Sequence, residues 1–502
     1  MSTITGATPA IRNYSLFIDG TWTESRSGKF VDNRNPARIA EVLGHVPLAL
    51  ESEVDAAVDA AERAFKTWRR TPAPRRGKIV AAAAAILARR KEEVARALTL
   101  EEGKILRESR GEVERSINIL DFIAGESRRF GGETLPSELE YNFCYTVRQP
   151  LGVVAVITPW NFPVAIPCWK IAPALVAGNT VVFKPATLTP LTASLVVEIF
   201  SEAGLPPGCL NLILGSGGQV GDRLVRHPAV RAVSFTGSNE IGGRLYAQGA
   251  ERMIKVQCEM GGKNPVVVLE DADLELAAAA TAAGAFGSTG QRCTATSRAV
   301  VVDSIADRFA EAVVQRARAY KIGNGLDESV DMGPSVDEGQ LRTVLHYLDE
   351  GRREGARILC GGERLYGGEF DGGYFVAPTV FDHVGRGMSI AQEEIFGPVL
   401  SIQRVRDFDE ALEAANDVRF GLASSIFTRD CNRMFRFVDE IETGIAHVNS
   451  GTVGGEAQLP FGGIKATGVG PREQGTAALD FYSEVKTVYV DYTGQKRQGN
   501  LY

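Results

Sequence analysis

The run VVAVIT at residues 153–158 opens a regular alternation of strands and helices, and this alternation decides the fold class. Four more short runs rich in strand-forming residues follow it, at 180–184, 210–214, 232–236 and 255–259. Segments with helical apolar spacing separate these runs, at 164–177, 189–203, 218–226 and 239–250. Such alternation is typical of a parallel sheet covered by helices on both faces. The sequence therefore predicts an α/β protein.

A second alternating region follows between about residues 263 and 450. Strands are predicted there near 266–269, 297–302, 399–403, 423–427 and 445–449. Ahead of the first sheet, residues 17–48 have the pattern of short strands and turns, and residues 50–125 are strongly helical. A chain of 502 residues is too long for one core, so two or three domains are expected.

Two pieces belong to neither alternating region. Residues 138–148 and 481–490 are rich in β-forming residues and lie far apart in the sequence. Our hypothesis is that they pair as an arm that reaches a neighbouring subunit, giving a homodimer or homotetramer.

The composition makes several classes of protein improbable. The net charge is -7 and there is no long basic run, so the sequence lacks the positive patch that binding to nucleic acid requires. No apolar run has transmembrane length, and residues 1–6 lack the pattern of a signal peptide. Seven cysteines without a CxxC pair suggest a reduced, cytoplasmic protein, and five scattered histidines make a metal site improbable.

Cys293, in the stretch STGQRCT at 288–294, is the strongest candidate for a nucleophile. Most free cysteines are small buried core residues, and we assign Cys144, Cys168, Cys209, Cys360 and Cys431 to that class. Glycines and hydroxyl residues surround Cys293 instead, and Arg292 adjoins it. Positive charge and backbone N–H groups are expected to favour its thiolate.

Glu259 and Asn161 both follow strands at the edge of the first predicted sheet where ligands bind. Glu259 is placed for general-base work, with a pKa raised by partial burial, or else pairs with Lys263. Asn161, between two prolines, either forms a turn or donates its amide to a developing oxyanion together with the Cys293 N–H.

Other strand ends carry groups that suit a nucleotide. The segment 237–242 (GSNEIG) joins a strand to a helix, where N–H groups favour phosphate, although it is not the complete dinucleotide fingerprint. Lys184 reaches ribose or phosphate, or lies along the surface. Glu394 is a candidate to accept hydrogen bonds from a second ribose.

Taken together, these residues resemble the NAD(P)-dependent aldehyde dehydrogenase superfamily over essentially the whole chain. The matching motifs are PWNFP at 159–163, KPA at 184–186, FTGS at 235–238, EMGGK at 259–263, GQRC at 290–293, EIFGP at 394–398 and PFGG at 460–463. Seven motifs in one order and spacing are far more specific than any one of them.

The resemblance implies a Rossmann-like parallel-sheet cofactor domain, an α/β catalytic domain and a small β oligomerisation arm. These correspond to residues 1–132 with 151–261, to 262–470, and to 133–150 with 481–502. It further implies that Cys293 attacks an aldehyde, that Asn161 holds the oxyanion, and that Glu259 activates the hydrolytic water. Lys170 and Glu473 match positions proposed to relay a proton outward from that glutamate. The expected cofactor contacts are Thr158, Pro159, Trp160, Lys184, Thr187, Gly217, Gly237, Ser238, Gly261, Glu394 and Phe396.

Thr187 departs from many NAD-preferring relatives, which carry a glutamate three residues after the lysine. A carboxylate there would repel a 2′-phosphate, whereas threonine can donate to it. We therefore expect NADP or NAD as cofactor, with NADP accepted.

Within the family, residues 288–295 and 169–175 look most like the α-ketoglutaric semialdehyde dehydrogenases. Arg115 and Arg292 are candidates to bind a distal carboxylate; alternatively each forms a surface ion pair, Arg115 with Glu112 or Glu114. The expected apolar wall of the substrate site is Phe162, Ile166, Trp169 and Phe461. The alternatives are a broad aliphatic or aromatic aldehyde oxidiser, a CoA-acylating enzyme, which the presence of Glu259 disfavours, and a non-catalytic nucleotide-binding relative.

Overall fold

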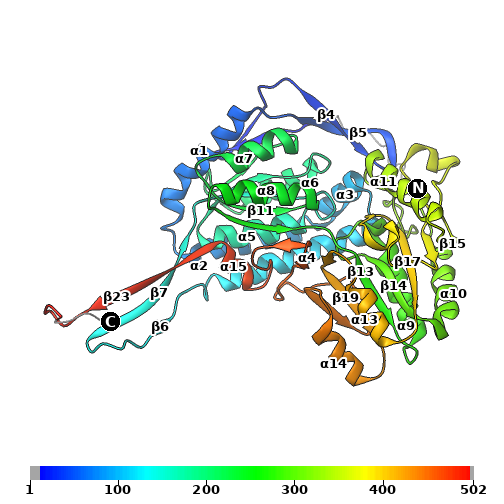
Figure 1. Ribbon diagram of the computed structural model, residues 1–502. Coiled ribbons are helices and arrows are strands. Elements are labelled where there is room, and N and C mark those ends of the chain that lie inside the picture. Colours follow the sequence, from blue (N-terminus) through cyan, green and yellow to red (C-terminus); the bar gives the residue numbers. More distant parts are fainter. Residues whose placement is uncertain (1–11, 498–502) are drawn as a thin grey trace.

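The computed structural model describes residues 12–497. The chain forms two bodies, each built around one large sheet, and the sheet of the first body has eight strands in the order β22-β12-β11-β8-β9-β10-β2-β3 (Figure 1). The five central strands run parallel, as the alternation predicted. They are β8 (Val153–Ile157), β9 (Thr180–Lys184), β10 (Leu210–Leu212), β11 (Val230–Thr236) and β12 (Lys255–Glu259). The edge strands are β2 (Leu16–Ile18), β3 (Thr21–Thr23) and β22 (Gly468–Val469).

Helices cover both faces of this sheet, which explains its apolar strands. Every residue of β8 and β9 is buried, and only such two-sided burial suits runs like VVAVI. One face carries α1 (Glu51–Trp68), α7 (Asp222–Arg226) and α8 (Asn239–Glu251). The other carries α5 (Ala165–Ala177) and α6 (Pro190–Glu202), with α2 (Ala73–Arg89), α3 (Lys91–Glu102) and α4 (Leu106–Glu126) packed outside them.

The second body is a seven-stranded sheet in the order β15-β16-β17-β14-β13-β19-β20, parallel except for β15. Five of its strands were predicted: β13 (Asn264–Val268), β14 (Thr296–Val302), β17 (Val399–Val405), β19 (Ala423–Phe427) and β20 (Ile445–Val448). The sequence analysis missed two short ones, β15 (Arg357–Cys360) and β16 (Thr379–Asp382). The helices of this body are α9 (Leu274–Phe286), α10 (Asp303–Ala319), α11 (Glu338–Arg353), α12 (Ser389–Gln392), α13 (Phe408–Asn416) and α14 (Cys431–Glu440).

Only residues 260–263 connect the last parallel strand of the first sheet to β13 of the second. The carboxyl edge of one sheet therefore faces the amino edge of the other. Cys293 precedes β14 and Phe396 precedes β17, so both lie at that amino edge. The expected ligand edge of the first sheet thus becomes one wall of a cleft between the two bodies.

A β-ribbon projects from the first body (Figure 1). It pairs β7 (Asn142–Pro150) antiparallel with β23 (Ser483–Asp491), and β6 (Thr134–Leu135) adds a third strand. The predicted pairing of the two unassigned pieces is therefore confirmed; their contact with a neighbouring subunit stays a prediction. Smaller elements are β1 (Arg12–Asn13), β4 (Phe30–Asn35), β5 (Arg38–Pro47), β18 (Phe420–Gly421), β21 (Ile464–Lys465) and α15 (Ala477–Phe481).

Within residues 12–497 no helix combines the length and the apolarity that crossing a membrane requires. The predicted segments 1–132 and 481–502 extend beyond the described residues at 1–11 and 498–502, and the expectation about residues 1–6 lies outside them.

Candidate active site

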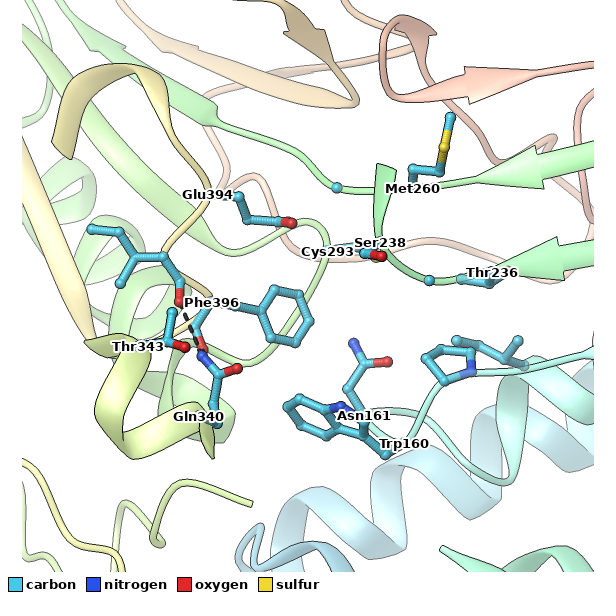
Figure 2. Close-up of a pocket in the computed structure, with 15 residues that line it drawn as sticks. Trp160, Asn161, Thr236, Ser238, Met260, Cys293, Gln340, Thr343, Glu394 and Phe396 are labelled. Atoms are coloured by element: carbon cyan, nitrogen blue, oxygen red, sulfur yellow. Dashed lines mark hydrogen bonds between the residues drawn. The ribbon is translucent and has the colours of Figure 1, made fainter. Parts of the chain in front are cut away.

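Cys293 lies on the wall of two cavities, each of about 260 Å³, which approach it from different sides. In the first cavity, Figure 2 shows Phe396 and Glu394 coming from the second body and Trp160 and Asn161 from the first. The second cavity opens between α4, the start of α5 and the segment around Phe461. Cys293 thus lines both the first and the second cavity.

A tight turn presents Cys293 at this point. Residues 287–290 form one 3₁₀ turn after α9, in which Ser288, Thr289 and Gly290 have φ of 48°, 57° and 67°. The Ser288 N–H donates to Glu108 Oε1 (2.8 Å), and Asn264 Nδ2 donates to the Cys293 carbonyl (2.8 Å). These bonds fix the backbone on both sides of the sulfur.

The expectation that local charge would favour the Cys293 thiolate is wrong for this structure. Burial, followed by the negative fields of Glu394 and Glu259, raises the pKa of the Cys293 thiol to about 12, against smaller opposing effects of Arg115 and the Thr294 N–H. Arg292 does not supply the expected charge, because its Nη2 pairs with Glu108 Oε1 at 2.7 Å. The cysteine therefore needs a base to accept its proton.

Glu259 is buried at the end of β12 and accepts a hydrogen bond from the Gly463 N–H (3.3 Å). Burial, and next the charge of Glu473, raise its pKa well above the ordinary value, with Lys170 opposing. The negative charge of Glu259 acts on the Cys293 thiol, although Glu259 lines neither cavity. The alternative pairing with Lys263 is wrong: the Lys263 ammonium has no hydrogen-bond partner within residues 12–497.

Behind Glu259 lies a buried polar group that contains both predicted relay residues. Lys170 Nζ forms an ion pair with Glu473 and donates to Ser234 Oγ (2.8 Å). The indole N–H of Trp169 donates to the other oxygen of Glu473 (2.8 Å). The sequence analysis missed Ser234, because a serine inside a buried strand has no local signal of function.

Asn161 is buried, and its side chain reaches the segment that carries the cysteine. Its Nδ2 donates to the Gln291 carbonyl at 3.1 Å, and the residue lines the first cavity. The amide therefore lies beside the nucleophile, as an oxyanion donor must.

Most of the expected cofactor contacts line the first cavity. Those that do are Pro159, Trp160, Gly237, Ser238, Gly261, Glu394 and Phe396; Thr158, Lys184, Thr187 and Gly217 are outside its lining. The sequence analysis missed five lining residues, namely Thr236, Met260, Gln340, Thr343 and Ile395. Gln340 Nε2 donates to the carbonyls of Ile395 and Phe396 (3.0 Å each), so α11 holds the loop of Phe396 in place (Figure 2).

The contacts of Glu394 and Lys184 restrict what each of them can do. Glu394 Oε1 accepts from the Gly262 N–H (2.9 Å), and a Cβ on Gly261 would approach Glu394 Oε2 to 2.1 Å, so any larger residue there would displace the Glu394 carboxylate. Burial raises the pKa of Glu394 to about 7. Lys184 is buried, which lowers its pKa to about 8, and its ammonium donates to the Pro185 carbonyl (2.8 Å).

The second cavity gathers five of the six expected substrate residues, Arg115, Phe162, Trp169, Arg292 and Phe461. The sixth, Ile166, was expected on the same wall but lines the first cavity. Three more charged residues line the second cavity: Lys104 and Glu108, which the sequence analysis did not single out, and Glu112, which it named only as a possible partner of Arg115. No short motif marks them, because they lie on or next to α4 and reach the site only through tertiary packing.

Arg115 is not engaged in either of the ion pairs considered as alternatives. Glu112 binds Lys104 (2.8 Å) and Glu114 binds Lys91 (2.8 Å). The guanidinium instead stacks on Trp169, 5.6 Å from the ring centre, and donates to Gln474 Oε1 (3.2 Å), while its buried Nε has no hydrogen-bond partner within residues 12–497. Arg115 therefore faces the second cavity with no carboxylate partner among residues 12–497.

A cysteine that lines two separate cavities, with a buried carboxylate behind it, is an arrangement that suits an enzyme acting on carbonyl compounds. The aldehyde dehydrogenase family model matches residues 22–488, and the chain belongs to that family. Across residues 12–497, no cluster of three or more His, Cys, Asp or Glu side chains is arranged to hold a metal ion.

Three comparisons place the chain within the family. It is 49% identical to the alpha-ketoglutaric semialdehyde dehydrogenase of Bacillus subtilis, over 95% of this chain and 98% of that one. It is 44% identical to the 2,5-dioxopentanoate dehydrogenase of Saccharolobus solfataricus, over 95% and 99%. A crystal structure of betaine aldehyde dehydrogenase from Staphylococcus aureus with NAD+ superimposes with a TM-score of 0.93 at 37% identity, covering 96% of this chain and 95% of that one.

Proposed function

We propose that the protein oxidises a short aldehyde carrying a distal carboxylate, such as 2-oxoglutaric semialdehyde, to the dicarboxylic acid with NAD or NADP. The observation that carries the substrate assignment is Arg115, which faces the cavity of Cys293 and has no carboxylate partner in the described part of the chain. An arginine fork matches a carboxylate in shape and charge. The names of the two semialdehyde dehydrogenases above support the same substrate class.

The cofactor fits the first cavity on two grounds. The N-terminus of α8, at Gly237 and Ser238, opens onto it and suits phosphate, and Glu394 offers carboxylate oxygens to ribose hydroxyls. Pro159, Trp160, Gly261 and Phe396 supply the remaining walls. When bound there, the nicotinamide supplies a two-electron acceptor for hydride.

The chemistry of the chain itself begins at Cys293. Its proton passes to Glu259, the sulfur forms a bond to the aldehyde carbon, and the Asn161 amide with the Cys293 N–H holds the oxygen that becomes negative. Glu259 first passes this proton to Lys170 and Glu473 and becomes a carboxylate again. After oxidation to the thioester, it takes a second proton from water while the resulting hydroxide attacks the acyl carbon. The carbon–sulfur bond then breaks, the acid leaves, and Lys170 with Glu473 passes the proton outward.

The substrate proposal is tested with Arg115→Ala. We expect kcat/KM for 2-oxoglutaric semialdehyde to fall roughly 10- to 100-fold, the cost of one hydrogen bond to a charged group, and kcat/KM for pentanal to stay within about threefold. The matched control is Arg110→Ala, which removes an exposed arginine of the same helix that pairs with Glu92 and Glu328. Equal losses on both aldehydes would instead favour a broad-range aldehyde oxidiser.

The dual use of cofactors rests on Thr187, whose hydroxyl donates to the Gly215 carbonyl (3.2 Å) and leaves no negative charge at that position. Thr187→Glu should lower kcat/KM for NADP at least about tenfold and leave the value for NAD nearly unchanged, because a carboxylate repels the 2′-phosphate. Steady-state kinetics with both cofactors measure this ratio. The proposal is rejected if the NADP/NAD ratio does not move.

We also propose that the β-ribbon of β7 and β23 joins identical subunits into a homodimer or homotetramer. Its support is a set of exposed apolar side chains on the ribbon, Phe143, Val485, Tyr489 and Val490. The odd number of cysteines supports a cytoplasmic location, where thiols stay reduced.

A further inference from the structure

A fully buried lysine, Lys104, lies beside the candidate active site and has no role in the chemistry described so far. It follows Gly103, which ends α3 with φ of 95° and turns the chain inward. A Cβ on Gly103 would lie 2.9 Å from Cγ of both Pro36 and Pro334, so the turn requires glycine. The side chain of Lys104 is 1% exposed and lines the second cavity.

The ammonium of Lys104 makes contacts that leave it little freedom. It donates to Glu112 Oε2 (2.8 Å) and to the backbone carbonyl of Asn161 (2.6 Å), and it lies 4.2 Å from the centre of the Phe162 ring. Burial opposes its charge, but Glu102 and Glu112 more than offset that effect and raise the pKa of Lys104. The residue therefore stays cationic in the pH range of any assay.

The other oxygen of Glu112 binds the same segment of chain from its far end. Glu112 Oε1 accepts from the N–H of Val164 (2.9 Å) and from that of Ala165 (3.1 Å), at the start of α5. One ion pair thus holds residues 161–165 by a carbonyl at one end and two N–H groups at the other. Two prolines, Pro159 and Pro163, further limit the motion of that segment.

We propose that Lys104 is a positioning residue, which acts through the Asn161 carbonyl to aim the Asn161 amide at the oxygen of the reacting carbonyl. The inference rests on the proposed oxyanion role of Asn161. A donor stabilises an oxyanion only when it is held at hydrogen-bond distance before the charge develops, so a shift of about 1 Å removes most of its effect. Lys104 holds the main chain of Asn161, and the Asn161 side chain donates to the Gln291 carbonyl, which is itself in the loop of Cys293.

The test is a double-mutant cycle on a reaction that needs no cofactor. Attack of Cys293 on 4-nitrophenyl acetate forms a carbon–sulfur bond and a tetrahedral oxyanion, whose collapse expels 4-nitrophenolate and leaves the acetyl thioester. The rate of that burst is measured for Lys104→Met, Asn161→Ala and the combination. We expect Asn161→Ala to slow it about 100-fold, Lys104→Met about 10- to 100-fold, and the combination no more than about threefold beyond Asn161→Ala.

Two further variants keep the test decisive if Lys104→Met unfolds because the buried Glu112 carboxylate has lost its cationic partner. The pair Lys104→Met/Glu112→Gln removes both charges together, and it should give the same non-additive result. Lys91→Met is the matched control, because Lys91 of α3 forms a partly exposed ion pair with Glu114 of α4, and it should leave the burst unchanged.

Multiplicative losses in the cycle would overturn the inference, because a residue that only stabilises the fold acts equally in both backgrounds. A loss confined to 2-oxoglutaric semialdehyde, with a normal ester burst, would also overturn it and make Lys104 a direct substrate contact. An unchanged burst in Asn161→Ala alone would refute the proposed oxyanion role, and the inference would fall with it.

Discussion

Burial sets the proton affinity of the two groups on which the proposed reaction depends. It raises the pKa of Cys293 and that of Glu259, and the negative field of Glu259 adds to the effect on the sulfur. A raised carboxyl pKa makes Glu259 a stronger base, which is what removal of a proton from so weak an acid requires. The same burial therefore keeps the Cys293 thiol protonated and unreactive, and it makes Glu259 a more effective base.

This residue-scale view predicts a steep dependence of thiol reactivity on pH. Because the pKa of Cys293 is raised to about 12, its thiolate fraction should grow roughly tenfold for each pH unit between 7 and 9. The rate of inactivation by iodoacetamide without cofactor measures that fraction. Cys293→Ala serves as the background, since Cys431 is exposed and also reacts. A rate that levels off below pH 9 would contradict the prediction.

At the scale of elements, the turn between α9 and β14 decides where the sulfur lies. Three successive residues there have positive φ, and only the last of them is a glycine. Gly290 packs directly against the loop of Phe396, because a Cβ would approach the Gly397 carbonyl to 2.1 Å. The nucleophile and one wall of the first cavity are therefore fixed to each other by the absence of a side chain.

Gly290→Ala should destabilise the protein by roughly 2–5 kcal/mol, from overpacking and from the left-handed backbone together. Urea unfolding measures the change. The matched control is Gly243→Ala in α8, where nothing lies within 4 Å of a Cβ, and alanine should stabilise that helix by up to about 1 kcal/mol. Equal stability of the two variants would show that the turn tolerates a side chain.

At the scale of the whole molecule, the β-ribbon projects away from both bodies (Figure 1). Several of its apolar side chains are exposed. Val485 is 58% exposed and Tyr489 is 72% exposed, in a strand whose ladder with β7 is complete. Monomers seldom retain such a projecting apolar strand, so a partner copy is the expected cover.

Val485→Asp/Tyr489→Asp should therefore lower the mass measured by light scattering to that of a smaller species, with the helical content unchanged. Tyr366→Asp is the control, because Tyr366 is similarly exposed (71%) but far from the ribbon in sequence and in the fold. The same large mass for both variants would argue that another surface joins the subunits.

Periodicity and local motifs were sufficient to predict both sheets, the pairing of the arm, and the gathering of Cys293 and Asn161 at one site. A parallel strand that is buried on both faces is a nearly continuous apolar run, so it can be recognised in the sequence. The carboxyl ends of such strands lie at the edge of the sheet where ligands bind. The two missed strands, β15 and β16, are four residues each, and a run that short carries too weak a pattern.

The sequence by itself determined the class of fold and the family, and it predicted the nucleophile, because these depend on short-range patterns. Only the tertiary structure decided that Arg115 is free of Glu112, that Lys104 holds the Asn161 carbonyl, and that the Cys293 thiol keeps its proton. Ion-pair partners and proton affinities depend on which charges meet and how much water is excluded, and packing between distant segments sets both.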